Sequence, residues 1–323
     1  MDMDSIEAET KAVDVIINEA LGSNGVENLD ISNCQLLLVP EDIGRIAGIR
    51  FINLSHNQLE VLPDFITTLE ILEHLDVSSN RLQNLPDSIG LLPKLKTLRV
   101  SRNNLASIPD SISLCNSLIE LDASFNMLTL LPKNIGYGLP NLQRISFHLN
   151  KIRVLPSSFS ELTSLRYMDA HFNSLTSLPV SFGRLICLEV LNLSNNFINF
   201  TELPLSFGDL ISLREVDLSN NQIRRLPDSF WKLENLKKLE LEGNPVVVPP
   251  REVVEKGVEE VREFMEKRWK EIVSVEMESK NAANGDSGWV AWGSSVATGW
   301  ANGAMRFFNG EQVPSDPYLD QLL

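Results

Sequence analysis

Two histidines near the middle of the chain, His148 and His171, have the side chains and spacing from which a chemical site could be built. They lie 23 residues apart, which is also the length of a unit that recurs along the chain. Equal positions of successive units stand side by side in a repeating fold, so the two imidazoles would be neighbours. Such a pair could bind zinc with Asp169 or Asp122. No other carboxylate or cysteine completes such a site, and we predict no bound metal.

The sequence lacks the short motifs that mark an enzyme. A glycine-rich loop that binds phosphate, a Cys-x-x-Cys pair and a His-Glu-x-x-His zinc motif are all missing from it. The serines near the histidines occupy repeat positions, where nothing activates them as nucleophiles. We therefore predict that the chain is not an enzyme and uses no cofactor.

The element that must position these residues is a leucine-rich unit. Its clearest copy is LEHLDVSSNRLQNLPDSIGLLPK, residues 72–94. Leu75 and Val77 alternate with polar residues, which predicts a short strand with these two side chains facing inward. Pro86 and the apolar spacing after it predict an irregular or short helical return. Ten copies begin at Val26, Ile49, Leu72, Leu95, Leu118, Leu142, Leu165, Leu188, Leu213 and Leu236, and the fifth and eighth are lengthened to 24 and 25 residues.

A polar residue follows each strand at the same place in the unit. An asparagine amide there can bond backbone groups that would otherwise be buried without partners, at a cost of about 1–3 kcal/mol each. Cys34 takes this place in the first unit, which has a neighbour on one side alone. We predict a structural ladder formed by Asn57, Asn80, Asn103, Asn126, Asn150, Asn173, Asn196, Asn221 and Asn244.

One unit cannot bury its own leucines, so the units must stack. We predict an α/β leucine-rich repeat solenoid, or horseshoe, with a parallel concave β-sheet, an irregular or short-helical convex side and helical caps. Residues 1–25 are predicted to form an N-terminal helical cap, with a partner-binding helix as the alternative. Residues 26–250 hold the ten repeats, and residues 251–280 form a C-terminal capping helix.

Residues 281–323 form a C-terminal tail rich in Trp and Gly. Three of the five tryptophans lie there, namely Trp289, Trp292 and Trp300. We predict that they pack against the cap helix or the last repeats, because burial of each is worth roughly 2–3 kcal/mol. Binding to a partner is the alternative, and contact with a membrane is disfavoured because Arg306 is the single basic residue of the tail.

The outward positions of the predicted sheet suggest where a partner binds. The fifth position of the units is mostly Asp or Asn, but this acidic stripe is broken at Arg99 and Ser146. Arg and aromatic side chains are enriched at the centres of protein interfaces. The convex side shows Ser, Asp and Gly, and there we expect no cluster of large side chains. We predict partner binding by Arg99, Arg102, Arg144, His148, Tyr167, His171 and Phe172, with packing against the asparagine turn as the alternative for the phenylalanine.

Composition narrows the environment and the partners. The net charge of −15 argues against nucleic acid and anionic membranes. No run of 18 apolar residues occurs, the start is acidic, and the three cysteines are scattered. We predict a cytoplasmic monomer without a transmembrane segment, and a nuclear location is the alternative.

Several segments resemble the plant intracellular Ras-group-related leucine-rich repeat proteins. They are PKNIGYGLPNLQRISFHLNKIR (132–153), MDAHFNSLTSLP (168–179), REFMEKRW (262–269) and DPYLDQLL (316–323). The resemblance implies a non-enzymatic scaffold for protein–protein interaction in intracellular signal transduction, with a small GTPase or a signalling enzyme among the candidate partners. A regulatory or targeting subunit of a phosphatase or ubiquitin-ligase complex is the alternative.

Overall fold

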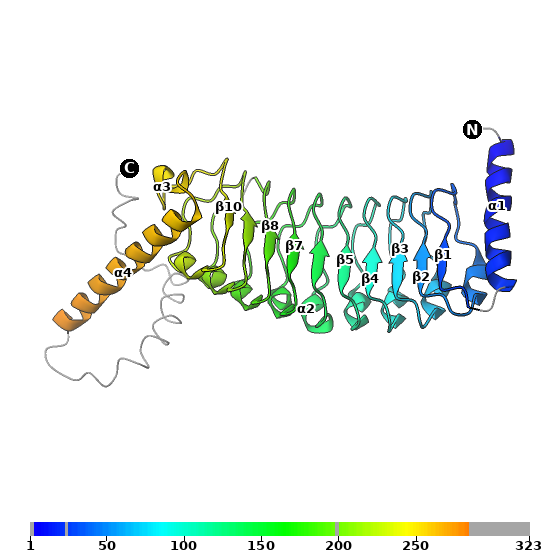
Figure 1. Ribbon diagram of the computed structural model, residues 1–323, viewed down its shortest axis with the longest axis horizontal. Helices are drawn as coiled ribbons and strands as arrows, with labels where there is room; N and C mark the ends of the chain where they lie inside the picture. The colour runs from blue at the N-terminus through cyan, green and yellow to red at the C-terminus, as the bar shows by residue number, and fades with distance from the viewer. Residues whose placement is uncertain (1–2, 23–24, 198–199, 284–323) are drawn as a thin grey trace.

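The computed structural model describes residues 3–22, 25–197 and 200–283. Within this part of the chain, ten short strands form one open parallel sheet, in which each strand pairs with the next in sequence order (Figure 1). The chain is therefore a leucine-rich repeat solenoid, as the repeat pattern predicts. The strands are β1 Asn28–Asp30, β2 Phe51–Asn53, β3 His74–Asp76, β4 Thr97–Arg99, β5 Glu120–Asp122, β6 Arg144–Ser146, β7 Tyr167–Asp169, β8 Val190–Asn192, β9 Glu215–Asp217 and β10 Lys238–Glu240.

Alternation within each strand separates the core from the exposed sheet face, which is called the concave face below. The central residue faces inward, so that Leu75, Leu98 and Leu121 are each at most 1% exposed. Strand register then aligns equal positions of neighbouring repeats, as where Glu120 lies beside Arg144 and Arg144 beside Tyr167. Each outward position therefore forms a column of side chains across the sheet.

Short helices on the opposite, convex side return the chain to the next strand. Most of them are single 3₁₀ turns entered from a proline, whose fixed φ suits the start of a helical turn. Glycine lets neighbouring turns approach closely, because a Cβ on Gly136 would lie 1.6 Å from the carbonyl oxygen of Ser158. The 3₁₀ helices are η1 Glu41–Arg45, η2 Asp64–Thr68, η3 Asp87–Leu91, η4 Asp110–Leu114, η5 Ser157–Glu161, η6 Phe182–Arg184, η7 Leu205–Asp209 and η8 Phe230–Lys232, and α2 Ile135–Gly138 takes this place in the fifth repeat.

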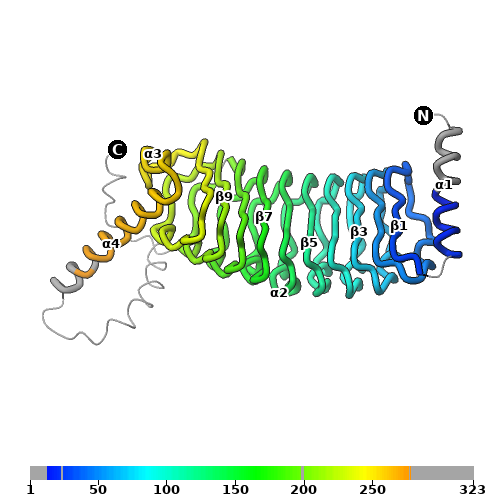
Figure 2. Tube along the Cα trace, in the orientation of Figure 1, coloured from blue at the N-terminus to red at the C-terminus, as the bar shows by residue number. Residues whose placement is uncertain are grey.

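Helices cover both ends of the solenoid (Figures 1 and 2). At the N-terminal end, α1 Met3–Gly22 buries Val13, Ile17 and Ala20. At the C-terminal end, the sequence predicts one helix from about Arg251, but two are present, α3 Arg251–Val254 and α4 Val258–Ala283. Gly257 separates them with a φ of 120°, a conformation that does not continue a helix.

The first turns of α4 close the C-terminal end of the core. Val261 and Met265 are fully buried, and Arg268 Nε donates to Asp228 Oδ1 at 3.1 Å. The rest of α4 projects away from the repeats (Figure 2). The predicted packing of Trp289, Trp292 and Trp300 lies outside the described residues.

The asparagine after each strand links three stretches of backbone. Asn126 Nδ2 donates to the carbonyl oxygens of Val100 at 3.0 Å, Ala123 at 3.2 Å and Ser124 at 3.1 Å. Its Oδ1 accepts the N–H of Leu105 at 2.9 Å. Val100 and Leu105 belong to the preceding repeat, so each such amide joins two repeats as well as closing its own turn.

We predict that Asn126→Ala lowers the free energy of unfolding by about 1–3 kcal/mol, because it leaves buried backbone groups without partners. Chemical denaturation measures this loss. The matched control is Asn104→Ala, which alters an exposed asparagine in the neighbouring turn. Equal stability of the two variants would show that the ladder does not stabilise the fold.

We also predict that Met265→Ala lowers stability by about 2–5 kcal/mol, because it opens a cavity between α4 and the last repeat. Thermal unfolding and limited proteolysis near residue 257 report this change. Lys267→Ala, on the exposed side of the same helix, should leave both measurements unchanged. If Met265→Ala behaves like that control, α4 does not close the core.

A candidate protein-binding surface on the concave face

The acidic stripe of the sheet is partly used to hold the ends of the strands. Asp76 Oδ1 accepts the N–H of Ser78 at 2.9 Å and its hydroxyl at 2.6 Å. Asp122 makes the same pair of bonds to Ser124, at 3.0 and 2.6 Å. These carboxylates therefore already accept hydrogen bonds from their own chain. They attract a basic partner less strongly than a row of unbonded carboxylates would.

The two central histidines replace the serine of this motif in repeats six and seven. Their rings stack with centroids 4.4 Å apart and planes inclined by 10°. His171 Nδ1 lies 2.6 Å from Asp169 Oδ1, and His148 Nδ1 lies 3.6 Å from Asp169 Oδ2. Burial lowers the pKa of His148 below its ordinary value, although Asp169 opposes this shift and His171 adds to it.

Three arginines near this pair differ in what they bind. Arg99 forms an ion pair with Glu120, with Nη2 and Oε1 3.1 Å apart, so its charge is already matched. The Arg102 guanidinium lies 4.3 Å from the centre of the Phe125 ring, and that of Arg144 lies 4.5 Å from the Tyr167 ring. Within the described residues, neither Arg102 nor Arg144 has a carboxylate at ion-pair distance. The concave face thus presents two cations that are held over aromatic rings and are available to a partner.

Large side chains in the central repeats occupy a backbone position that disfavours them. The residue before each ladder position has positive φ. It is Asn33, Asn195 or Asn220 in repeats one, eight and nine, where asparagine suits this conformation, and His56 or Ser79 in repeats two and three. The central repeats instead place Arg102 (φ 54°), Phe125 (φ 53°), Leu149 (φ 54°) and Phe172 (φ 49°) there. Phe125 and Phe172 are 37% and 42% exposed, so core packing does not explain the choice.

These residues form a continuous aromatic row, defined here as Phe125, His148, His171, Phe172 and Phe197. Successive ring centroids lie 5.2, 4.4, 5.5 and 5.8 Å apart. Phe197 is missing from the sequence-based prediction because it follows the ladder asparagine and lies beyond the strand. A comparison of that position across the repeats would have found it, since Met127 occupies the same place and is 49% exposed.

A ladder of ion pairs along the same sheet is interrupted in the central repeats. The second position of the units carries Glu27, Arg50, Glu73 and Lys96 in succession, joined by ion pairs, and then Arg166, Glu189 and Arg214, joined likewise. Between the two series stand Ile119 and Gln143. The charge pairing is thus interrupted in repeats five and six, which carry Phe125 and His148 of the aromatic row.

The convex side carries a cluster that the sequence analysis misses. Leu91 and Leu114 end η3 and η4, Tyr137 is the last residue but one of α2, and the three are 65%, 60% and 68% exposed. They share one position of the repeat unit. The expectation that this side lacks a cluster of large exposed side chains is therefore wrong, because the residue after the Gly or Ser of these turns is large and points outward. This cluster is called the convex stripe below.

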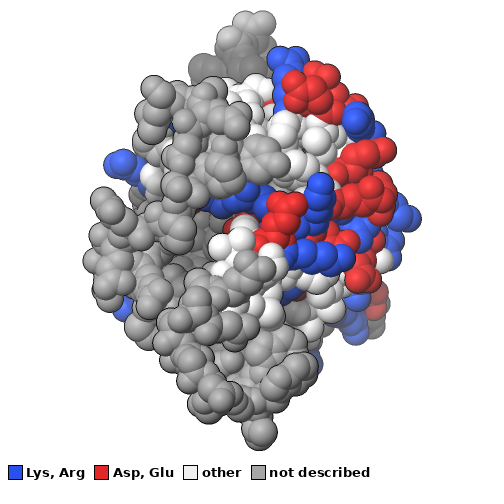
Figure 3. Space-filling model, turned by 90° about the vertical axis from the view of Figure 1, so that its left-hand side faces the viewer, with Lys and Arg blue, Asp and Glu red and all other residues white. Residues whose placement is uncertain are grey.

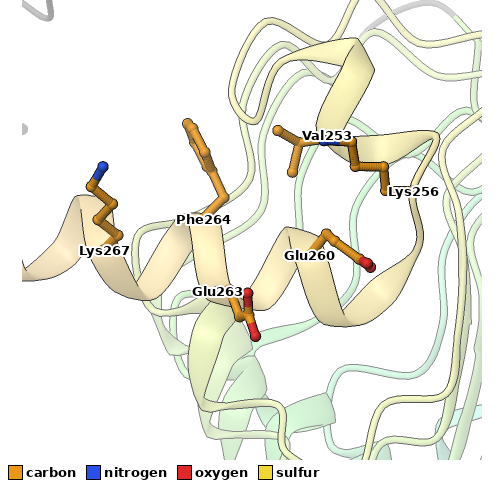
Figure 4. A pocket seen from close by; sticks show the side chains of 6 residues that line it. All are labelled: Val253, Lys256, Glu260, Glu263, Phe264 and Lys267. Carbon is orange, nitrogen blue, oxygen red and sulfur yellow. The ribbon is translucent and has the colours of Figure 1, made fainter.

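The C-terminal end offers a less specific surface. An open recess beside α4 is lined by Val253, Lys256, Glu260, Glu263, Phe264 and Lys267 (Figure 4). Acidic and basic side chains are interleaved at this end of the molecule (Figure 3), as in the pair of Arg262 with Glu259. Among the described residues, no helix has the length and apolar character needed to cross a membrane.

Comparisons with known sequences agree with the observed repeats. One leucine-rich repeat region model matches residues 26–129, and a leucine rich repeat model matches residues 116–175 and 188–246. Plant intracellular Ras-group-related LRR protein 3 of Arabidopsis thaliana is 50% identical over 149 residues, which cover 45% of this chain and 32% of the relative. The protein of the same name from Oryza sativa subsp. japonica is 48% identical over 147 residues, covering 43% and 33%. The chain thus spans about a third of the length of these relatives.

Solved structures share the fold. An internalin from Listeria monocytogenes superposes with a TM-score of 0.54 at 20% identity, covering 75% of this chain and 76% of its own. A TDR receptor gives a TM-score of 0.56 at 28% identity, covering 72% of this chain and 45% of its own. The chain belongs to the leucine-rich repeat proteins and is related to the plant intracellular Ras-group-related LRR proteins.

Proposed function

We propose that the chain is a non-enzymatic scaffold that binds a protein partner on the concave face of repeats four to seven. The observation that carries this proposal is the placement of Arg102, Phe125 and Phe172 at positive-φ positions with their side chains exposed. An L-residue other than Gly, Asn or Asp costs about 1–2 kcal/mol in this conformation. These side chains do not pack in the core, and they strain the backbone. We infer that they are present because they contact a partner.

The chemistry of the face selects the kind of partner. Arg102 and Arg144 would pair with carboxylates of the partner, and the aromatic row would pack against its apolar or aromatic side chains. Tyr167 adds a hydroxyl and remains neutral, because burial, with Asp169 adding to it, raises its pKa. An acidic segment that also carries aromatic residues would satisfy both features.

The convex stripe supports the further proposal that the scaffold holds two proteins at once. Leu91, Leu114 and Tyr137 point away from the concave face, so a second partner could bind there without competing with the first. A regulatory or targeting subunit of a phosphatase or ubiquitin-ligase complex needs such a pair of surfaces. The relatives are named intracellular, and we propose a cytoplasmic monomer that acts in signal transduction.

We predict that Arg144→Ala combined with Tyr167→Ala weakens partner binding by about 2 kcal/mol or more, because interface hot spots concentrate in such side chains. Thermal unfolding should change little, since Arg144 is exposed and Tyr167 faces out of the sheet. Quantitative affinity purification from plant extract, compared with the unmodified chain, measures the loss. Binding to the recovered partner is then titrated with purified proteins.

The comparison variant is Leu114→Ala combined with Tyr137→Ala, which removes two large side chains from the convex stripe and should keep the concave-face partner while losing a second protein bound to the stripe. If this comparison variant loses the partner and the concave variant retains it, the convex stripe is the binding site. If both variants recover the same proteins at the same yield, neither surface binds them.

We further predict that Phe172→Asn weakens partner binding while stability stays unchanged or rises by up to about 1 kcal/mol. Asparagine accepts the φ of 49° that Phe172 adopts. Chemical denaturation and the same binding titration separate the two effects. A stability loss above about 2 kcal/mol would instead assign Phe172 a packing role against the asparagine turn.

A further inference from the structure

The seventh position is serine in repeats one to five, eight and nine, whereas repeats six and seven carry His148 and His171 there. In several repeats this serine donates to the Asp or Asn two residues earlier, as Ser78 does to Asp76 and Ser194 to Asn192. A hydroxyl is therefore sufficient to close this turn. The use of imidazole in two adjacent repeats calls for a reason other than the turn itself.

The two imidazoles converge on one carboxylate. Ligand atoms of His148, Asp169 and His171 all lie within 4.8 Å of one another. Both Nδ1 atoms face Asp169, at 2.6 Å for His171 and 3.6 Å for His148. The Asp169 side chain is 10% exposed and the two imidazoles are 22% and 19% exposed. The three side chains therefore lie on the surface of the concave face, mostly buried by their neighbours, with a small part of each exposed to solvent.

From this geometry we propose that His148, Asp169 and His171 bind one divalent transition-metal ion of the zinc type. Imidazole is a borderline ligand that suits zinc, cobalt or nickel, and these ions also accept a carboxylate, whereas magnesium and calcium prefer oxygen ligands alone. Three protein ligands leave a further position of the ion open toward the concave face. A carboxylate or imidazole from outside the chain can occupy it.

Binding requires small movements of the side chains. Ligand atoms around a tetrahedral zinc ion lie about 3.3 Å apart, given bonds of about 2.0–2.1 Å. The contact between His171 and Asp169 must therefore lengthen slightly, and the stacked rings must splay so that the ion lies in both ring planes. The ion takes the place of the proton at His171 Nδ1, and the ring then carries its proton at Nε2, so that it binds the ion as a neutral imidazole.

Neighbouring side chains contact the three ligands. The Tyr167 hydroxyl lies 3.5 Å from Asp169 Oδ2 and can hold the carboxylate in place. Ser146 Oγ lies 2.9 Å from His148 Nδ1, and Asn192 Nδ2 lies 3.5 Å from His171 Nδ1. The ion displaces these two contacts when it binds the Nδ1 atoms.

The test is calorimetric titration of tag-free, EDTA-treated full-length protein with ZnCl₂, together with the visible absorption spectrum after addition of CoCl₂. We expect one ion per chain and a cobalt spectrum with nitrogen and oxygen ligands. His148→Ser and His171→Ser should each weaken zinc binding at least 10-fold. Both restore the serine of the other repeats, so they are expected to fold.

The control is His74→Ser, which removes a histidine that stacks on Phe51 in repeats two and three, three repeats before His148. Asp169→Asn keeps the size of the carboxylate and should also lose the ion. Absence of zinc binding by the unmodified chain would overturn the proposal. Equal zinc affinity in all four variants would also overturn it, because it would indicate an adventitious ion only. Because no partner protein is present, this result is independent of the proposed scaffold function.

Discussion

Hydrogen bonding between adjacent repeats is the constraint on which the rest of the structure depends. The N–H and C=O groups of each three-residue strand form hydrogen bonds with the adjacent strands. Each ladder asparagine bonds the backbone of two repeats at once, as Asn126 does. A single repeat therefore has unsatisfied backbone groups on both sides. The same requirement explains the ends, where α1 and the first turns of α4 cover leucines that no further repeat would bury.

Regular stacking turns each position of the repeat into a column, and this determines where chemistry can accumulate. Substitutions at one position of successive repeats fall side by side, although they are 23 residues apart in the sequence. The stacked rings of His148 and His171 are the clearest example. A solenoid can thus build a local site from single changes in neighbouring repeats while its core and ladder stay intact.

The central repeats differ from the ends in three ways at once. The charge ladder stops there, bulky residues occupy the positive-φ position, and Arg102 and Arg144 lie over aromatic rings rather than beside carboxylates. Each feature lies on outward-facing side chains, so none of them improves the packing of the core. Their coincidence in one region makes the concave centre the best candidate for binding, and the convex stripe gives the molecule a second face.

The sequence by itself determined the repeat unit, the number of repeats and the inward and outward positions, because a fixed period leaves one way to bury the leucines. It also identified Arg144, Tyr167 and His171 as outward-facing, since alternation along a strand is local. Only the tertiary structure decided that Arg99 is paired with Glu120 and that both histidines turn to Asp169. It likewise revealed Phe197 and the exposure of Leu114. These features depend on side-chain directions and on contacts between repeats, which periodicity does not specify.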